Sequence, residues 1–220
     1  MNINYQLEME KTIAAWHAPD GRKPVLLLHS CCAPCSSAVL ERLAAHFTIY
    51  DFYYNPNISP ETEYRHRAEE LRRLIREMGL EPGVQMVEGA YEPERFARIA
   101  AGLEGEPEGG RRCTRCFALR LEEAAREAAR READFFTTTL SISPHKDARR
   151  LNEIGKQMGE KYGVPYLFSD FKKKDGFKRS TILSEQYGLY RQNYCGCIFS
   201  RREAEERERA KAREKASAAR

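Results

Sequence analysis

Short apolar runs alternate with longer amphipathic stretches along most of this chain. The run Pro24–His29 is almost continuously apolar, which is typical of a strand buried on both faces of a sheet. The β-branched and aromatic residues of Thr48–Tyr54 predict a second strand. Further strands are expected at Val84–Val87, Phe135–Leu140 and Val164–Phe168.

The segments around these strands have the spacing of amphipathic helices, with helix signals such as Pro34 in a first turn and Gly79 after a last turn. Strands that alternate with helices predict an α/β fold in which helices cover both faces of a parallel sheet. Ligands bind such folds beyond the carboxyl ends of the strands. Helices are expected at residues 3–16, from Pro34 to about His46, and at Thr62–Met78, Pro93–Ala101, Arg115–Arg131 and Lys146–Tyr162.

The 220 residues suit one domain with appendages, and 41% hydrophobic residues exclude wholesale disorder. Residues 201–216 contain only Ala, Glu, Arg and Lys, so they cannot contribute to a core. We therefore expect a helical extension at residues 1–22, an α/β domain at 23–200, and a charged tail, helical or disordered, at 201–220.

The net charge of +4 is concentrated in the tail, where residues 201–220 hold eight basic and five acidic side chains. The rest of the chain is nearly neutral, so a contact with RNA must come from local patches. The longest aliphatic run, Val25–Leu28, is far shorter than the ~20 residues of a membrane span. The first twenty residues do not resemble a secretory signal, and a cytosolic (cytoplasmic) location is expected.

Seven cysteines form three tight groups, namely Cys31-Cys32-x-x-Cys35, Cys113-x-x-Cys116 and Cys195-Gly196-Cys197. A disulfide framework is not expected in a cytosolic chain of this size. Such clustering indicates metal binding or redox chemistry.

The first group joins a strand to a helix. Thiols at a helix N-terminus have a lowered pKa, and the thiolate is the form that binds iron or zinc. Two alternatives are cysteines that merely fill the strand end, and thioredoxin-like exchange by Cys32-Ala33-Pro34-Cys35.

The second group has a spacing at which both sulfurs can reach one metal centre. Cys31, Cys32, Cys113 and Cys116 together supply four thiolates, which matches a [4Fe-4S] cluster or a closed zinc site. The spacing alone does not separate these two. Four neighbouring arginines could offset thiolate charge, bind phosphate or form a solvated face: Arg111, Arg112, Arg115 and Arg120.

The third group differs in kind, because a C-x-C spacing is tight for chelation but can close into a strained, labile disulfide. Gly196 permits the backbone distortion that such a ring requires. Cys195 and Cys197 are therefore candidates for a redox-active pair, with a pair of structural thiols as the alternative.

Three polar stretches carry weaker signals. Tyr53–Asn57 follows the second strand, at the expected ligand edge or in an ordinary loop. Thr137–Lys146 offers hydroxyls and a helix start to a phosphate. Ser169–Arg179 places five basic residues among two phenylalanines, as in single-stranded RNA sites or in a solvated lysine loop.

Five motifs in order resemble the epoxyqueuosine reductase QueH family: LLLHSCCAPCSS, YYNPNISPETEYRHR, RRCTRCFALRL, FTTTLSISPHKD and LYRQNYCGCIFS. The resemblance extends from about Lys23 to Ser200. It implies a Rossmann-like α/β fold related to adenine-nucleotide hydrolase-like enzymes. It also implies reduction of epoxyqueuosine to queuosine at the wobble position of tRNA, the last step of queuosine synthesis.

The same resemblance implies a [4Fe-4S] cluster carried by Cys31, Cys32, Cys113 and Cys116. It implies a redox-active Cys195–Cys197 pair and a second iron beside the cluster, for which Cys35 is the remaining thiol. The partners would be tRNA carrying epoxyqueuosine and an electron donor that the sequence does not identify.

Related ATP-dependent tRNA thiolases carry a Ser-Gly-Gly-x-Asp-Ser pyrophosphate loop after the first strand. His29-Ser30-Cys31-Cys32 stands there instead, so use of ATP is not expected. Asp170, His145 and the tyrosines near Cys195 are unranked candidates for proton donors. Two other function classes remain open at this stage, a thiol–disulfide oxidoreductase and a zinc-stabilised RNA-binding module.

Overall fold

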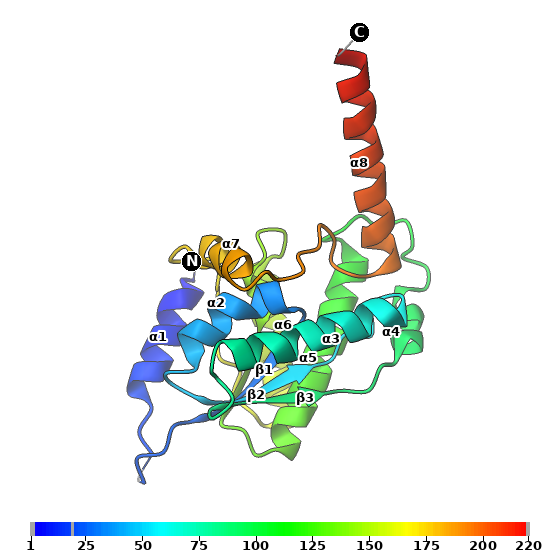
Figure 1. Cartoon of the computed structure of the whole chain (residues 1–220). Coiled ribbons are helices and arrows are strands. Elements are labelled where there is room, and N and C mark those ends of the chain that lie inside the picture. Colours follow the sequence, from blue (N-terminus) through cyan, green and yellow to red (C-terminus); the bar gives the residue numbers. More distant parts are fainter. Residues whose placement is uncertain (1–2, 19, 219–220) are drawn as a thin grey trace.

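A parallel sheet with the strand order β3-β2-β1-β4 organises the computed structural model (Figure 1). Its strands are β1 (Val25–Ser30), β2 (Thr48–Tyr53), β3 (Val84–Glu88) and β4 (Phe135–Thr138). The structure describes residues 3–18 and 20–218. Residues 1–2 of the expected N-terminal extension, residue 19, and residues 219–220 of the expected tail lie outside the described part.

Helices follow the strands in the order expected from the sequence, with a further helix before the C-x-C motif. α5 begins four residues before the expected start, so both cysteines of the C-x-x-C motif lie within it. The helical elements are α1 (Tyr5–Ala15), α2 (Ala33–Leu43), α3 (Glu61–Glu77), α4 (Pro93–Ala100), α5 (Arg111–Arg130), the 3₁₀ turn η1 (Thr139–Ile142), α6 (Ala148–Tyr162), α7 (Gly176–Gln186) and α8 (Ile198–Ala218).

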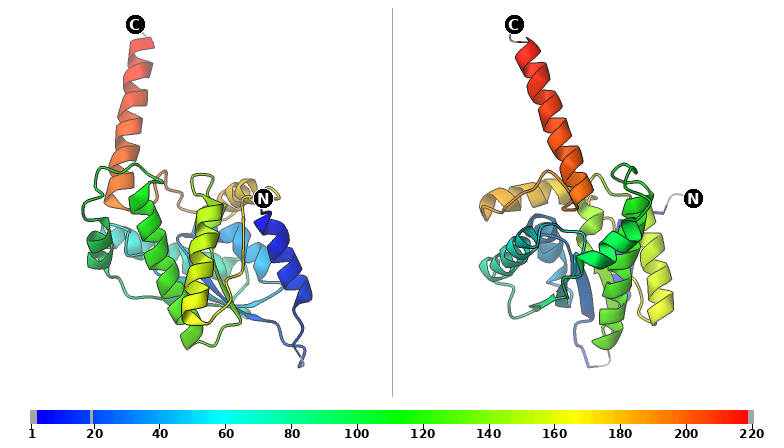
Figure 2. Two further views of the ribbon diagram at one scale, coloured as in Figure 1. Left: turned by 180° about the vertical axis from the view of Figure 1, so that it is seen from behind. Right: turned by 90° about the vertical axis from the view of Figure 1, so that its right-hand side faces the viewer.

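Alternate residues of β1 pack on opposite faces of the sheet, because side chains alternate along a strand. Leu26 and Leu28 belong to the core cluster beneath α1, α2 and α3. Leu27 belongs to a second cluster with Phe117 of α5 and Leu151 of α6. Figure 2 shows helices on both sides of the sheet. The expected α/β architecture, a parallel sheet covered on both faces in a Rossmann-like arrangement, is confirmed.

The strand expected at Val164–Phe168 is wrong in extent, since a single parallel bridge joins Phe136 to Tyr166. Pro165 has no N–H to donate to a ladder, although its carbonyl accepts from Phe136. The ring of Tyr166 lies against Gly155 of α6, where an added Cβ would come within 2.4 Å of that ring. This close packing stabilises the segment in place of further pairing.

Two helices near the C-terminus differ from the sequence expectation. α7 begins at Gly176, inside the stretch interpreted as a loop, and an added Cβ there would lie 1.8 Å from the carbonyl oxygen of Phe171. α8 begins at Ile198, directly after the C-x-C motif, and projects away from the rest of the chain (Figure 1). Among the described residues, none of the helices combines the length and apolar character that crossing a bilayer requires.

The strand order reverses at β1. β2 and β3 extend the sheet on one side of β1, whereas β4 pairs on its other side. In open parallel sheets, this reversal leaves a crevice beyond the carboxyl ends of the two strands that flank it, here β1 and β4. Cys31 follows β1 and Thr139 follows β4, so the first cysteine group lies at this crevice.

Candidate metal and redox centre

Three cysteines meet at the junction of β1 and α2. Cys31 and Cys32 follow the strand, and Cys35 lies in the first turn of the helix. Their sulfur atoms all lie within 4.8 Å of one another, and the Cys31 and Cys32 sulfurs are 3.8 Å apart. A tetrahedral ion with metal–sulfur bonds of about 2.3 Å separates its sulfurs by about 3.8 Å. The geometry therefore fits three thiol ligands of one metal centre.

Hydrogen bonds among these thiols favour one thiolate. Contacts from Cys32 and then Cys35 hold the pKa of Cys31 well below its usual range, although burial opposes this. The hydrogen bond between Cys32 and Cys31 raises the pKa of Cys32 to about 12. A separate hydrogen bond between Cys35 and Cys31 raises the pKa of Cys35. A metal bound by all three must displace protons from the last two, so its affinity rises with pH.

The second and third cysteine groups share another cavity. Cys113 and Cys116 lie near the start of α5, where the N–H of Gly109 donates to the Cys113 sulfur at 3.2 Å. Together with Cys195 and Cys197, they line a cavity of about 20 Å³. Burial raises the pKa of the Cys116 thiol to about 12 and also raises the pKa values of Cys113 and Cys197. Burial therefore favours the protonated form of these thiols over the thiolate that binds a metal.

The C-x-C motif depends on its glycine. Gly196 has φ of +125°, and a Cβ there would lie 2.9 Å from the side chain of Ile58. The main-chain N–H and the hydroxyl of Ser200, in the first turn of α8, lie 3.4 and 3.3 Å from the Cys197 sulfur. None of the seven cysteines, all of which the structure describes, is joined to another in a disulfide.

A larger cavity of about 590 Å³ lies over the first cysteine group. Cys31, Cys32 and Cys35 line it together with Cys195, which therefore lines both cavities. Lys146 also lines the large cavity, and such a volume lies in the range typical of small-molecule sites.

The four expected cluster ligands are thus distributed between two neighbouring groups. Cys31 and Cys32 lie with Cys35, whereas Cys113 and Cys116 lie with Cys195 and Cys197. The groups are neighbours in the fold, because Cys113 packs against the core cluster that contains Cys31 and Cys32. Sequence spacing did not indicate that the C-x-C motif would lie so close to the C-x-x-C motif.

Buried arginines surround the thiols. Arg120 and Arg112 are each 1% exposed, and Arg120 lies one helical turn after Cys116. The Nη1 of Arg120 and the Nε of Arg112 find no hydrogen-bond partner among the described residues. A buried N–H group that lacks a hydrogen-bond partner costs free energy, which an anionic acceptor can offset. The soft thiol donors and the spare N–H groups together fit a negatively charged iron–sulfur centre.

Two buried polar residues were missed by the sequence analysis. His29 lies between the Thr138 hydroxyl at 2.8 Å and the Tyr54 carbonyl at 3.0 Å. Burial lowers the pKa of His29 to about 3, so its ring is neutral, and the Arg120 guanidinium donates to Nε2 at 3.4 Å. Burial raises the pKa of Asp51, on β2, to about 7. Its only signal in the sequence is a lone carboxylate within an apolar strand.

Four hydroxyls at the end of β4 and in η1 are too buried to contact a phosphate, whereas Ser143 and Lys146 of the same stretch line the large cavity. The side chains of Thr137, Thr138, Thr139 and Ser141 are fully buried. The Thr137 hydroxyl donates to a main-chain carbonyl, and the Thr139 hydroxyl points to the Cys31 sulfur at 3.7 Å. These hydroxyls position the strand end beneath the cysteines.

The candidate proton donors lie at different depths. His145 and Tyr194 line the large cavity. Asp170 instead forms an ion pair with Lys172 at 2.9 Å. In the loop past β2, the side-chain amide of Asn55 donates to the Ser30 carbonyl at 2.9 Å, which attaches that loop to the end of β1.

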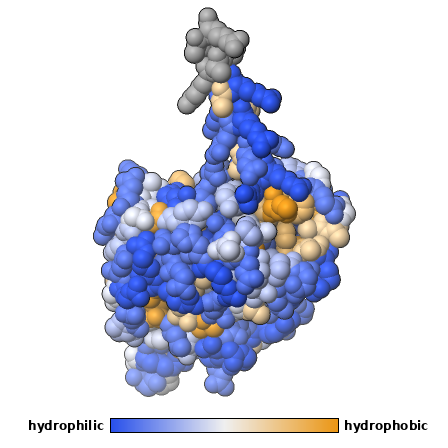
Figure 3. All heavy atoms as spheres, turned by 45° about the vertical axis from the view of Figure 1, so that its right-hand side comes forward, coloured by the Kyte–Doolittle hydropathy of each residue, from blue (hydrophilic) through white to orange (hydrophobic). Residues whose placement is uncertain are grey.

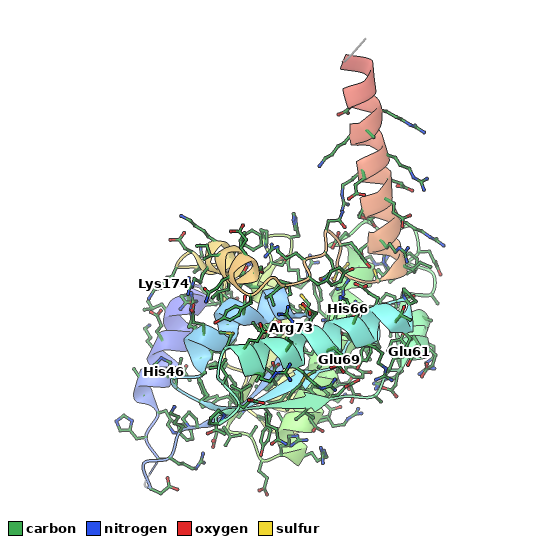
Figure 4. All side chains as sticks on the ribbon, viewed as in Figure 1. His46, Glu61, His66, Glu69, Arg73 and Lys174 are labelled. Carbon is green, nitrogen blue, oxygen red and sulfur yellow. The ribbon has the colours of Figure 1, made fainter. Side chains whose placement is uncertain are left out.

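Three of the five basic residues in the stretch Ser169–Arg179 form ion pairs with described residues, whereas Lys173 and Lys178 form none. Lys172 contacts Asp170, Lys174 contacts Glu10, and the Arg179 guanidinium is bidentate on Glu41. Figure 4 labels Lys174 at the end of the molecule where α1 and α7 approach each other. These ion pairs weaken the interpretation of the stretch as an open RNA patch.

Comparisons with known proteins give one consistent result. The sequence profile of a family described as epoxyqueuosine reductase QueH matches residues 26–203. Epoxyqueuosine reductase QueH of Staphylococcus epidermidis is 43% identical over 202 residues, which cover 90% of this chain and 84% of that protein. The proteins of the same name from Haemophilus influenzae and Thermotoga maritima are 41% and 37% identical, over 84% and 83% of this chain and 75% and 93% of their own lengths.

Proposed function

Because this chain belongs to the epoxyqueuosine reductase QueH family, we propose that it reduces epoxyqueuosine to queuosine at the wobble position of tRNA. The observation that carries the proposal from the structure is the large cavity, in which four thiols face a space of small-molecule size. Free thiols and a tRNA substrate suit a reducing compartment, so the proposed location is the cytoplasm.

The reaction converts an epoxide to an alkene. It consumes two electrons and two protons, and the epoxide oxygen leaves as water. A [4Fe-4S] cluster held by Cys31, Cys32, Cys113 and Cys116 would supply electrons singly, and a second iron near Cys35 would supply a Lewis acid. The close sulfurs of Cys31, Cys32 and Cys35, together with the unpartnered N–H groups of two buried arginines, support a metal centre at this place.

Cys195 and Cys197 are proposed as the redox-active pair. Closing a dithiol to a disulfide releases two electrons and two protons, which is the amount that one turnover consumes. An external electron donor then returns the disulfide to the dithiol. The position of Cys195 between both cavities and the permissive backbone of Gly196 support this role.

Charged side chains orient this machinery. Arg67 donates to the main-chain oxygen of Cys195 at 3.1 Å and is held from the other side by Glu63, through an Nε contact of 2.7 Å. Lys146 places its positive charge in the large cavity beside the first cysteine group. A positive charge near thiols favours their deprotonated form.

The test uses protein purified without oxygen and tRNA that carries epoxyqueuosine. After incubation with dithionite, digested tRNA is analysed by mass spectrometry for the nucleoside that has lost one oxygen. Cys113→Ala should abolish the product. Thr114→Ala, its neighbour outside the small cavity, should retain it.

The two alternatives predict other results. A thiol–disulfide oxidoreductase would act on dithiol substrates without iron. A zinc-stabilised RNA-binding module would be colourless and would form no product. Absence of product from iron-loaded wild-type protein would refute the proposed function.

A further inference from the structure

The first residues of α8 pack against the rest of the protein, whereas its later residues project into solvent. At its base, the buried guanidinium of Arg112 pairs with Glu203 at 3.3 Å and lies over the Phe199 ring at 4.2 Å. Ala204 is buried beside them. Every residue from Arg207 to Glu214 is exposed, and Figure 3 shows this projecting part as mostly hydrophilic. The base therefore fixes the direction in which the outer part of α8, residues 207–214, extends.

One face of α8 borders the large cavity. The lining includes Ala204, Arg207, Glu208 and Lys211, which have the i, i+3, i+4, i+7 spacing of a single helical face. Glu208 is engaged by the side-chain amide of Asn193. Arg207 and Lys211 form no ion pair with the described residues, although the carboxylates of Glu108 and Glu208 line the same large cavity.

The opposite face of α8 provides an internal comparison. Arg209 and Arg213 also lie in the outer part, and at ~100° per residue they point away from the cavity. Neither contributes to the cavity lining. The two basic pairs therefore share one exposed helix, and they differ in the direction that their side chains face.

The composition of the outer part of α8 favours a nucleic acid over a second copy of the chain as its partner. It carries four basic and two acidic side chains, and alanine is its only apolar residue type. A coiled-coil contact with a second copy needs large apolar residues at regular spacing. Exposed cations of this kind suit the phosphates of a nucleic acid.

The rim of the cavity opposite α8 offers aromatic and cationic surface. Phe177 is 39% exposed, and the Arg191 guanidinium lies 5.8 Å from the centre of its ring. Both residues line the large cavity. Such pairs commonly stack on unpaired bases in RNA complexes.

We propose that the cavity-facing side of α8, through Arg207 and Lys211, binds the backbone phosphates of the tRNA loop whose modified nucleoside enters the thiol cavity. This deepens the proposed function and rests on it. The basic contact surface is thereby assigned to α8, in place of the stretch Ser169–Arg179, where three of the five basic residues are already paired. In this proposal the RNA lies across the mouth of the large cavity, between α8 on one side and Phe177 with Arg191 on the other.

The test compares two double variants of the full-length protein, Arg207→Gln/Lys211→Gln and Arg209→Gln/Arg213→Gln. Both remove two positive charges from the same helix, and glutamine has a helix propensity similar to that of arginine and lysine. Binding of a fluorescently labelled anticodon stem-loop RNA is measured by anisotropy at several KCl concentrations. Circular dichroism verifies that both variants keep the helix.

Loss of two phosphate contacts should weaken binding roughly tenfold at low salt and should reduce the slope of log affinity against log salt by about 1.4. Only the cavity-facing variant should show this, with a raised KM and an unchanged kcat for reduction. Equal weakening by both pairs, or by neither, would overturn the proposal. A variant that keeps RNA binding but loses self-association in sedimentation would assign the face to a second copy, which also overturns it.

Failure of this proposal is distinct from failure of the proposed function. Suppose that the wild-type protein reduces tRNA-borne epoxyqueuosine and that the Arg207→Gln/Lys211→Gln variant binds RNA as tightly as wild type. The reductase assignment would then stand, and α8 would not be part of the RNA-binding surface. Wild-type protein that forms no product would refute the reductase assignment itself.

Discussion

The guanidinium of Arg67 donates a hydrogen bond to the main-chain carbonyl of Cys195 at 3.1 Å, across 128 residues of sequence. The same guanidinium lies over the ring of Tyr194 at 5.2 Å. Arg67 belongs to α3 and is only 2% exposed. This single side chain therefore attaches the C-x-C motif to the helical layer on one face of the sheet.

Removing this attachment should destabilise the protein. Arg67→Met leaves Glu63 without its buried partner, and breaking such a pair costs about 3 kcal/mol or more in the free energy of unfolding. Arg65→Met is the matched control on α3, because its ion pairs are solvent-exposed and should contribute less than about 1 kcal/mol. Urea denaturation measures both, and similar losses for the two variants would remove Arg67 from this role.

The four proposed cluster ligands give a second prediction. Cys31, Cys32, Cys113 and Cys116 should each be needed for iron, so an Ala substitution should lose most bound iron and all reductase activity. Cys35→Ala should retain the sulfide of the cluster and lose only the additional iron. Elemental analysis of iron and sulfide decides this, and a variant with full content of both takes that residue off the ligand list.

The C-x-C pair should behave differently from these ligands. Cys195→Ser and Cys197→Ser should keep the cluster but lose multiple turnover with the native electron source. A single turnover should survive when the metal centre is chemically reduced beforehand. Product per enzyme, measured together with iron content, tests this. Loss of iron would instead make the pair part of the ligand set, which the shared small cavity would permit.

Asp51 gives a prediction about pH. Burial raises its pKa to about 7 in the folded protein, against 3.8 as its usual value. Because the folded state binds the proton more tightly, this group lowers stability as pH rises from about 4 to 7. Asp51→Asn removes that dependence and should be more stable than wild type at pH 8, by at most about 4 kcal/mol.

Urea denaturation of both proteins at several pH values tests this prediction. The difference between their free energies of unfolding should grow with pH up to about 7 and then level off. A difference that is constant from pH 4 to 8 would show that Asp51 ionises normally.

Local patterns in the sequence predict most of the fold. The apolar run after Pro24 and the aromatic run after Thr48 form β1 and β2 nearly as expected. The segment at Val164–Phe168 has strand composition, but Pro165 and the packing of Tyr166 limit it to one bridge. α7 was missed because its start, Asp175-Gly176, has the composition of a turn. Its glycine is required by the nearby Phe171 carbonyl.

The site is predictable only in part, because local sequence patterns do not show which distant segments meet in the folded chain. Placement of Cys31 at the end of the first strand follows from local sequence, and the structure agrees. Proximity of Cys116 to Cys197 is a tertiary contact, made where the start of α8 packs beside α4 and α5. Spacing along the chain carries no information on such a contact. Burial of Asp51 likewise depends on helices that cover both faces of the sheet.

The most direct test of the central claim joins metal content to product in one sample. Anaerobically purified wild-type protein should be brown, should contain iron and sulfide, and should convert tRNA-borne epoxyqueuosine to queuosine when reduced. Mass spectrometry of the digested tRNA should show the nucleoside without its epoxide oxygen, in an amount that exceeds the enzyme. A colourless protein, or an iron-loaded protein that leaves the epoxide unchanged under reducing conditions, would contradict the account.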